Sequence, residues 1–178
     1  MIIKMKKVIL IITCFIFISC STQMKLNKSN EIDILINAPW KFEENYNISY
    51  IIKNKSSKTY IIDPYGFSGD SYWLFNNEKL NPIDYLRGYY TRYTDDDCKN
   101  TLIILKPKQK IDTTLNLNYR EKSIYNLSKP GKYIWNIKSN HSRKNSMPLT
   151  CKSYINTLEK KGYIMLEDSI VAKIPFIK

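Results

Sequence analysis

Apolar and polar residues alternate along much of the chain after residue 31, a pattern that predicts β-strands with one buried face. Isoleucine occupies every second position in 32–36, and isoleucine or tyrosine does so in 46–52. Similar signals predict further strands at 59–62, 72–75, 101–105, 111–119, 123–127, 133–137, 164–166 and 170–177. Pro175 favours a sheet-edge position for the last strand, because proline cannot donate to a strand ladder.

Residues 153–161 depart from this alternation. Tyr154, Ile155 and Leu158 are spaced as on one face of a helix, and Ser153 and Gly162 are suited to begin and end it. Many short strands separated by turn signals indicate an antiparallel sandwich or barrel. The pattern therefore predicts an all-β antiparallel fold with one short helix at 153–161.

The N-terminus has a different composition. Lys4, Lys6 and Lys7 precede an almost wholly apolar run from Val8 to Ile18. A charged start followed by an apolar run of this length is typical of a secretory signal peptide. The run is too short for a transmembrane helix, which needs about 20 apolar residues.

The end of this run, Phe17-Ile18-Ser19-Cys20, resembles the lipobox of bacterial lipoproteins, although Phe17 stands where leucine is usual. The resemblance implies that Cys20 receives a lipid and becomes the first residue of the mature chain. The open alternative is a secreted protein that is cleaved near Ser19 and keeps a free thiol. The polar stretch after Cys20 has no apolar period and predicts a flexible tether.

The expected organisation is a lipoprotein signal helix at 1–19, a flexible tether at 20–30 and one β-sandwich domain at 31–178. Ser21 after the lipid site resembles the sorting preference of many outer-membrane lipoproteins. We therefore expect a cell-envelope protein that is anchored by a lipid and faces the periplasm.

A second, local resemblance concerns the domain. Leu105-Lys-Pro107, the strand at 111–119 and the run from Leu127 through Pro130-Gly131 to Trp135 resemble a passage of immunoglobulin-like domains. The passage is also similar to the sandwich of bacterial proteinase inhibitors of the subtilisin-inhibitor type. The resemblance implies an immunoglobulin-like sandwich, but no inhibitory residue can be transferred onto this chain.

Cysteine usage and charge agree with export. Cys98 and Cys151 are left as a pair after the signal segment and the lipid site are set aside, and we hypothesise a disulfide between them. Three of the 28 basic residues leave with the signal and all 16 acids remain, which leaves a net charge of +9. Outside the cytoplasm the acidic partners are lipids, envelope polymers and proteins, so nucleic acid is not expected. A solvated basic surface without a partner is the alternative.

The stretch 76–100 is long, has no clear period and is rich in tyrosine and arginine, the residues that commonly anchor binding interfaces. We hypothesise that a protein partner contacts this loop, which Cys98 would hold in place. Its side chains could instead cover an open edge of the sandwich. The candidate residues are Tyr85, Arg87, Tyr89, Tyr90, Arg92 and Tyr93.

Catalytic and metal motifs are weak. Asp95-Asp96-Asp97 lacks the alternating acids of a calcium loop and indicates a solvated acidic turn. Gly66 to Asp70 departs from the nucleophile-elbow spacing, and His141 is the single histidine of the chain. Glu43, Glu44 and Asp70 are nominal carboxylates for hydrolysis, with no spacing that sets them apart. We therefore expect no catalytic residues, no metal and no cofactor.

Three functions remain. The favoured one is a non-enzymatic envelope lipoprotein that binds a protein or an envelope polymer. An inhibitor or immunity-type lipoprotein that blocks a hydrolase or toxin is the second. A carboxylate-dependent enzyme acting on the cell wall is the third.

Overall fold

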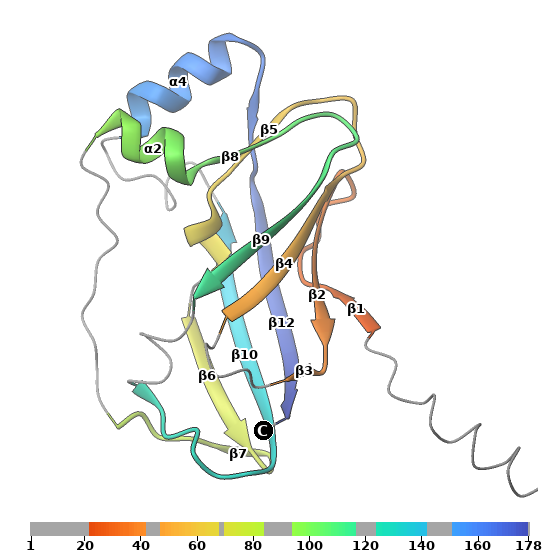
Figure 1. The fold of residues 1–178 in the computed structure, drawn as a ribbon, viewed down its shortest axis with the longest axis vertical. Helices are drawn as coiled ribbons and strands as arrows, with labels where there is room; N and C mark the ends of the chain where they lie inside the picture. The colour runs from red at the N-terminus through yellow and green to blue at the C-terminus, as the bar shows by residue number, and fades with distance from the viewer. Residues whose placement is uncertain are drawn as a thin grey trace, which may run out of the picture.

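The computed structural model describes residues 22–41, 47–67, 70–83, 94–116, 124–141 and 151–177 (Figure 1). The described chain is mainly β, with antiparallel sheets and two short helices. The expected signal helix and Cys20 lie outside the described residues. Within the described ranges, no helix is long and apolar enough to cross a membrane.

The first sheet has four strands in the order β1-β2-β4-β9, and all of its neighbours are antiparallel. These strands are β1 (Thr22–Lys25), β2 (Ile32–Ala38), β4 (Asn47–Asn54) and β9 (Lys110–Asn116). The alternating runs at 32–36 and 46–52 predicted two of them, and the run from 111 predicted a third. Because the side chains of a strand alternate between faces, isoleucines at every second position, such as Ile34, Ile48 and Ile52, lie on the inner face.

The second sheet has five strands in the order β3-β12-β10-β6-β7. They are β3 (Trp40–Lys41), β6 (Asp70–Phe75), β7 (Glu78–Lys79), β10 (Lys132–His141) and β12 (Asp168–Ile177). Pro175 had suggested that β12 is an edge strand. It is not, because β3 pairs with the last two residues of β12. Pro175 itself lies just before that pairing, so its missing N–H removes no bond to β3.

The main hydrophobic core receives side chains from both large sheets. Ile34, Ile48 and Ile52 come from the four-stranded sheet, and Trp73 and Trp135 come from the five-stranded sheet. The two indole rings stack with centroids 5.8 Å apart. The two sheets therefore form layers over one core, and the immunoglobulin-like order of their strands stays a prediction.

A third sheet, in the order β11-β5-β8, carries the two helices. Its strands are β5 (Tyr60–Ile62), β8 (Ile103–Leu105) and β11 (Ile164–Met165), and a 3₁₀ turn, η1 (Pro64–Phe67), follows β5. Tyr60 and Ile62 of β5 belong to the main core, whereas Ile61 belongs to a second, smaller core under the helices. One short strand thus connects the two cores.

The predicted helix at 153–161 is confirmed as α4 (Lys152–Lys160), whose Ile155 and Leu158 are buried. A second helix, α2 (Asp95–Thr101), occupies the end of the stretch 76–100 that we expected to be a loop and the first residue of the strand expected at 101–105. That stretch also contains β7, which a two-residue turn joins to β6. Asn76 and Asn77 of the turn both have positive φ, which asparagine tolerates better than most residues.

The segment 22–30, which we expected to be part of a flexible tether, belongs to the domain. Thr22–Lys25 pairs with Leu35–Ala38 of β2, and Leu26 and Asn27 are buried. The prediction failed because this strand has almost no apolar alternation of its own. The segment is stabilised instead by pairing of β1 with β2 and by contacts of Leu26 and Asn27 with β12.

The expected strand at 123–127 is also absent from its described part, 124–127. Tyr125 and Leu127 are buried, as the alternation suggested, but the side chain of Asn126 accepts a hydrogen bond from the backbone N–H of Ser128. Such a local bond replaces a strand ladder with a turn. The chain then passes through Pro130 and Gly131 into β10, as predicted.

Candidate functional site

The six tyrosine and arginine residues predicted to bind a partner, Tyr85, Arg87, Tyr89, Tyr90, Arg92 and Tyr93, lie outside the described residues. So do Cys20, Glu43 and Glu44. The structure does describe the residues on either side of 84–93. Before it, the backbone N–H of Ile83 donates to the carbonyl of Ile124 at 2.6 Å. After it, Thr94 begins helix α2. The described part of the candidate site therefore begins at Thr94.

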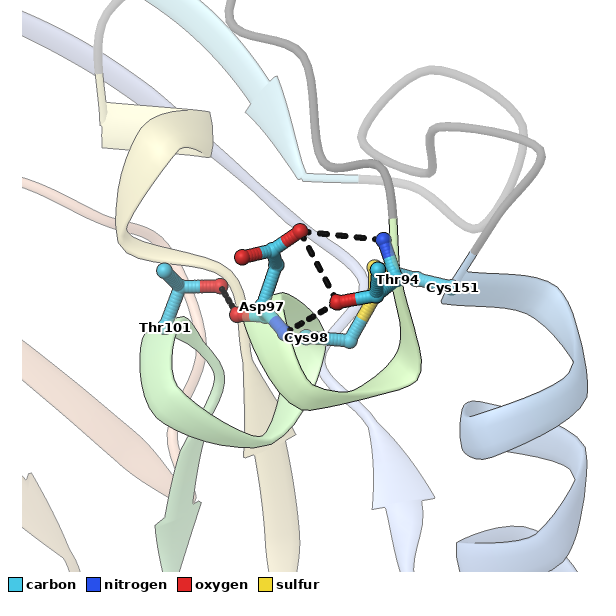
Figure 2. The surroundings of a disulfide bond; sticks show 5 residues. All are labelled: Thr94, Asp97, Cys98, Thr101 and Cys151. Carbon is cyan, nitrogen blue, oxygen red and sulfur yellow. Dashed lines mark hydrogen bonds between the residues drawn. A yellow bond between two sulfur atoms is a disulfide. The ribbon is translucent and has the colours of Figure 1, made fainter.

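Thr94 caps helix α2 through a reciprocal pair of hydrogen bonds with Asp97, drawn in Figure 2. The N–H of Asp97 donates to the Thr94 hydroxyl oxygen at 3.1 Å, and the N–H of Thr94 donates to the Asp97 carboxylate at 2.9 Å. The Thr94 hydroxyl also donates to that carboxylate at 3.0 Å. Two of the N–H groups that a helix start leaves without partners are thereby satisfied.

Asp95 and Asp96 are exposed, as expected of a solvated acidic turn, but the run at 95–97 is the first turn of this helix. Three carboxylates at a helix N-terminus are favourable because the helix dipole places partial positive charge there. The Thr94-x-x-Asp97 spacing is a capping signal that the sequence already contained. Among the described residues, no three His, Cys, Asp or Glu side chains are grouped as a metal site requires.

The disulfide predicted between Cys98 and Cys151 is present (Figure 2). Both cysteines are fully buried, and their Cα atoms lie 5.6 Å apart. The bond joins the first half of α2 to the residue that precedes α4. Around it packs the second core, formed by Ile61, Cys98, Leu102, Cys151, Ile155, Leu158 and Met165. The residue that follows 84–93 is thus attached to a covalently linked pair of helices.

His141 is the last residue of β10 and is fully buried. Its Nε2 lies 3.2 Å from the carbonyl oxygen of Asp63, and its ring centroid is 5.0 Å from that of Phe67. Gly66 lies so close that a Cβ there would be 2.8 Å from the imidazole. The described residues provide no hydrogen-bond partner for Nδ1. This histidine is packed as a core side chain at the polar end of β10.

Burial lowers the pKa of His141 below its ordinary value of 6.5, and the nearby Asp63 and Asp168 oppose this shift only in part. The imidazole is therefore neutral in the folded protein at neutral pH. A neutral imidazole can donate from Nε2 to the Asp63 carbonyl, which accounts for the short contact between them.

The remaining nominal carboxylate is exposed. Asp70 begins β6 and pairs in register with Lys138 of β10. Another acidic group, Glu31, binds Lys58 at 3.0 Å and accepts a hydrogen bond from the Tyr60 hydroxyl. The bond from Tyr60, together with Lys58, lowers the pKa of Glu31. These contacts join the start of β2 to the third sheet and have a structural role.

Comparison with known proteins leaves the class of the protein open: no family model matches the chain, and no curated protein matches it.

The disulfide makes a testable contribution to stability. It closes a loop of 53 residues, which restricts the unfolded chain by about 4 kcal/mol. We expect Cys98→Ala/Cys151→Ala, or reduction of the wild type, to lower the free energy of unfolding by about 3–4 kcal/mol in urea denaturation. An unchanged urea midpoint after verified reduction would show that the bond does not support the fold.

The burial of His141 predicts a pH dependence. As pH falls below 6.5, the unfolded chain takes up a proton that the folded protein excludes. The free energy of unfolding should therefore decrease by up to about 1.4 kcal/mol per pH unit below 6.5 and should not change through this group above it. Urea denaturation between pH 7 and 5 (roughly the range of histidine titration) measures this slope. His141→Gln is the comparison, because it removes the titration and should flatten the curve. Equal slopes in both proteins would contradict this assignment.

Proposed function

We propose that the chain is an exported, lipid-anchored envelope protein whose β domain binds another protein and catalyses no reaction. Export is supported by the signal-like N-terminus and by the Cys98–Cys151 disulfide, since disulfides persist in oxidising compartments. Anchoring is supported by the lipobox-like sequence that ends at Cys20. The proposed class of scaffold is an immunoglobulin-like sandwich, which suits the two layers over one core.

The observation that carries the binding proposal is the fixed start of helix α2. Thr94 follows directly on the tyrosine- and arginine-rich residues, and the capping bonds with Asp97 and the disulfide at Cys98 hold it. A binding segment that is fixed at its end loses less conformational freedom when it meets a partner. Tyrosine and arginine then supply contact area and directed hydrogen bonds.

The non-catalytic part of the proposal is supported by the surroundings of the candidate groups. The imidazole of His141 is enclosed by Phe67, Gly66 and the Asp63 carbonyl, so its ring serves packing. Asp70 lies on the surface beside Lys138. A general acid or base must come within hydrogen-bond reach of its substrate, and the packing around the His141 ring prevents this.

The test is a cross-linked pull-down of the acylated protein from its native membrane. We expect the wild type to capture one partner and Tyr89→Ala/Tyr90→Ala/Arg92→Ala to lose it, because hot-spot side chains carry most of the energy of an interface. Lys106→Ala/Lys108→Ala/Lys110→Ala is the matched control, since it removes two exposed side chains from the turn between β8 and β9 and one from the start of β9.

Two outcomes would contradict the proposal. If the tyrosine variant captures the partner as well as the wild type but unfolds more easily, these side chains cover the sandwich and do not bind. If both triple variants lose the partner to the same extent, the capture depends on charge or stability in general. Identification of a hydrolase or toxin as the partner would place the protein among inhibitors.

A further inference from the structure

The described part of the β domain begins two residues after the proposed lipid site. Thr22 is the first residue of β1 and pairs with Ala38 of β2. Because an extended chain spans at most about 3.6 Å per residue, Thr22 can lie no more than about 7 Å from Cys20. A tether that ended at residue 30 would have reached about five times as far.

The strand pairings identify the part of the domain that lies nearest to Thr22. Ala38 is followed by Pro39 and then by β3, whose Trp40 pairs with Phe176 at the end of β12. Ile177 in turn pairs with Lys132, the first residue of β10. Figure 1 shows β3, β7 and the C-terminus together at the lower end of the molecule, with α2 and α4 at the opposite end.

We call this lower region the proximal end and define it by Trp40, Lys79, Lys129, Lys132 and Ile177. Ile177 is 46% exposed although it is a large apolar residue. The ring of Trp40 is half-buried against Phe176, with centroids 4.9 Å apart. The proximal end therefore presents apolar and aromatic surface.

The same end is basic. Lys79, Lys129 and Lys132 are exposed, and Glu78 is the acidic neighbour that the described residues place beside them. Lys79 Nζ lies 4.9 Å from the Tyr72 ring centroid, and Lys129 Nζ lies 6.0 Å from that of Phe75. Lysine beside tyrosine, tryptophan and isoleucine is the composition that favours the interface of a membrane with anionic headgroups.

We propose that the proximal end rests on anionic lipid headgroups when Cys20 is acylated, with Ile177 at the lipid interface. This inference depends on the proposed lipid anchor. The short link is essential, because the attraction between lysine and a charged membrane fades within a Debye length of about 8–10 Å. The consequence is an orientation: α2, and with it the end of the binding segment, faces away from the membrane toward a partner.

The test measures depth in a bilayer for two positions of the acylated full chain. A polarity-sensitive fluorophore is attached at Ile177→Cys or, as the matched control, at Lys160→Cys, an exposed position at the end of α4. The vesicles contain phosphatidylethanolamine, phosphatidylglycerol and a lipid with a nitroxide quencher on its headgroup. We expect at least about twofold stronger quenching at 177 than at 160, because a nitroxide quenches only at close range while the domain is tens of ångströms long.

Charge is tested with two triple variants that carry the 177 probe. Lys79→Glu/Lys129→Glu/Lys132→Glu should abolish the excess quenching, whereas Lys106→Glu/Lys108→Glu/Lys110→Glu should retain it. For the unacylated Cys20→Ser chain, each lysine of the proximal end should contribute about fivefold to partitioning into the anionic vesicles. The same chain should show little partitioning into vesicles of phosphatidylcholine alone.

The failures are distinguishable. Mass spectrometry of the N-terminal peptide from native membranes reports whether Cys20 is acylated. An unmodified Cys20 overturns the proposed anchor and this orientation together. An acylated Cys20 with equal quenching at 177 and 160, or with equal effects of the two charge reversals, overturns the orientation alone.

Discussion

The carboxylate of Asp168, the first residue of β12, binds the residues that follow β1 through hydrogen bonds. It accepts hydrogen bonds from the Asn27 side chain at 2.6 Å and from the backbone N–H of Ser29 at 2.9 Å. Asn27 also donates to the Ile32 carbonyl and accepts from the Ile34 N–H, each at 2.8 Å. Hydrogen bonds to a charged carboxylate are stronger than neutral ones, and those of a buried amide are costly to break.

This junction connects the two large sheets along one edge. The N–H of Val171 donates to the Leu26 carbonyl, and Asn27 forms an isolated bridge with Ile170. β1 therefore pairs with β2 in the four-stranded sheet, and Leu26 and Asn27, which follow β1, connect it to β12 in the five-stranded sheet. Since β1 begins at Thr22, the same contacts decide how far the β domain lies from the proposed lipid site at Cys20, and hence how the proposed anchored protein would be oriented on a membrane.

The two ends of the described domain differ in composition and in the role that we propose for them. The end near β3 and β7 carries lysines, Trp40 and an exposed Ile177, and the proposed anchor attaches beside it. The other end is the small core under α2 and α4, closed by the disulfide. The apolar layers between them keep these ends apart, so a partner bound near Thr94 would meet the protein on the side away from the lipid.

The elements that could be predicted from the sequence are those whose own residues show the apolar spacing of a strand or a helix. Isoleucines at every second position predicted β2 and β4, and Tyr154, Ile155 and Leu158 predicted α4. β1 was missed because Thr22–Lys25 is polar and exposed along most of its length, and its pairing depends on distant residues such as Asp168. α2 was missed because Asp95–Thr101 is short and polar and has no apolar face. Its capping residues and the disulfide stabilise it instead.

The candidate site could be predicted only in part. Two cysteines left over after the signal segment were enough to predict the disulfide. The burial of His141 could not be predicted, because its neighbours in the sequence are polar and give no sign that this last residue of β10 is buried. The proximal end is assembled from four distant parts of the chain, and no local pattern indicates that Trp40, Lys79, Lys132 and Ile177 share one surface.

Hydrogen–deuterium exchange of the mature chain measures whether the folded β domain includes the residues from Thr22 onward. We expect the amides of 23–26 that face β2, such as that of Leu26, to be protected as β2 is. Asp168→Ala should expose them before β4 and β10, because the mutation removes only the junction. Exchange of 22–30 at the rate of an unstructured peptide in the wild type, with β2 and β4 protected, would contradict the account. It would restore a tether between the anchor and the domain.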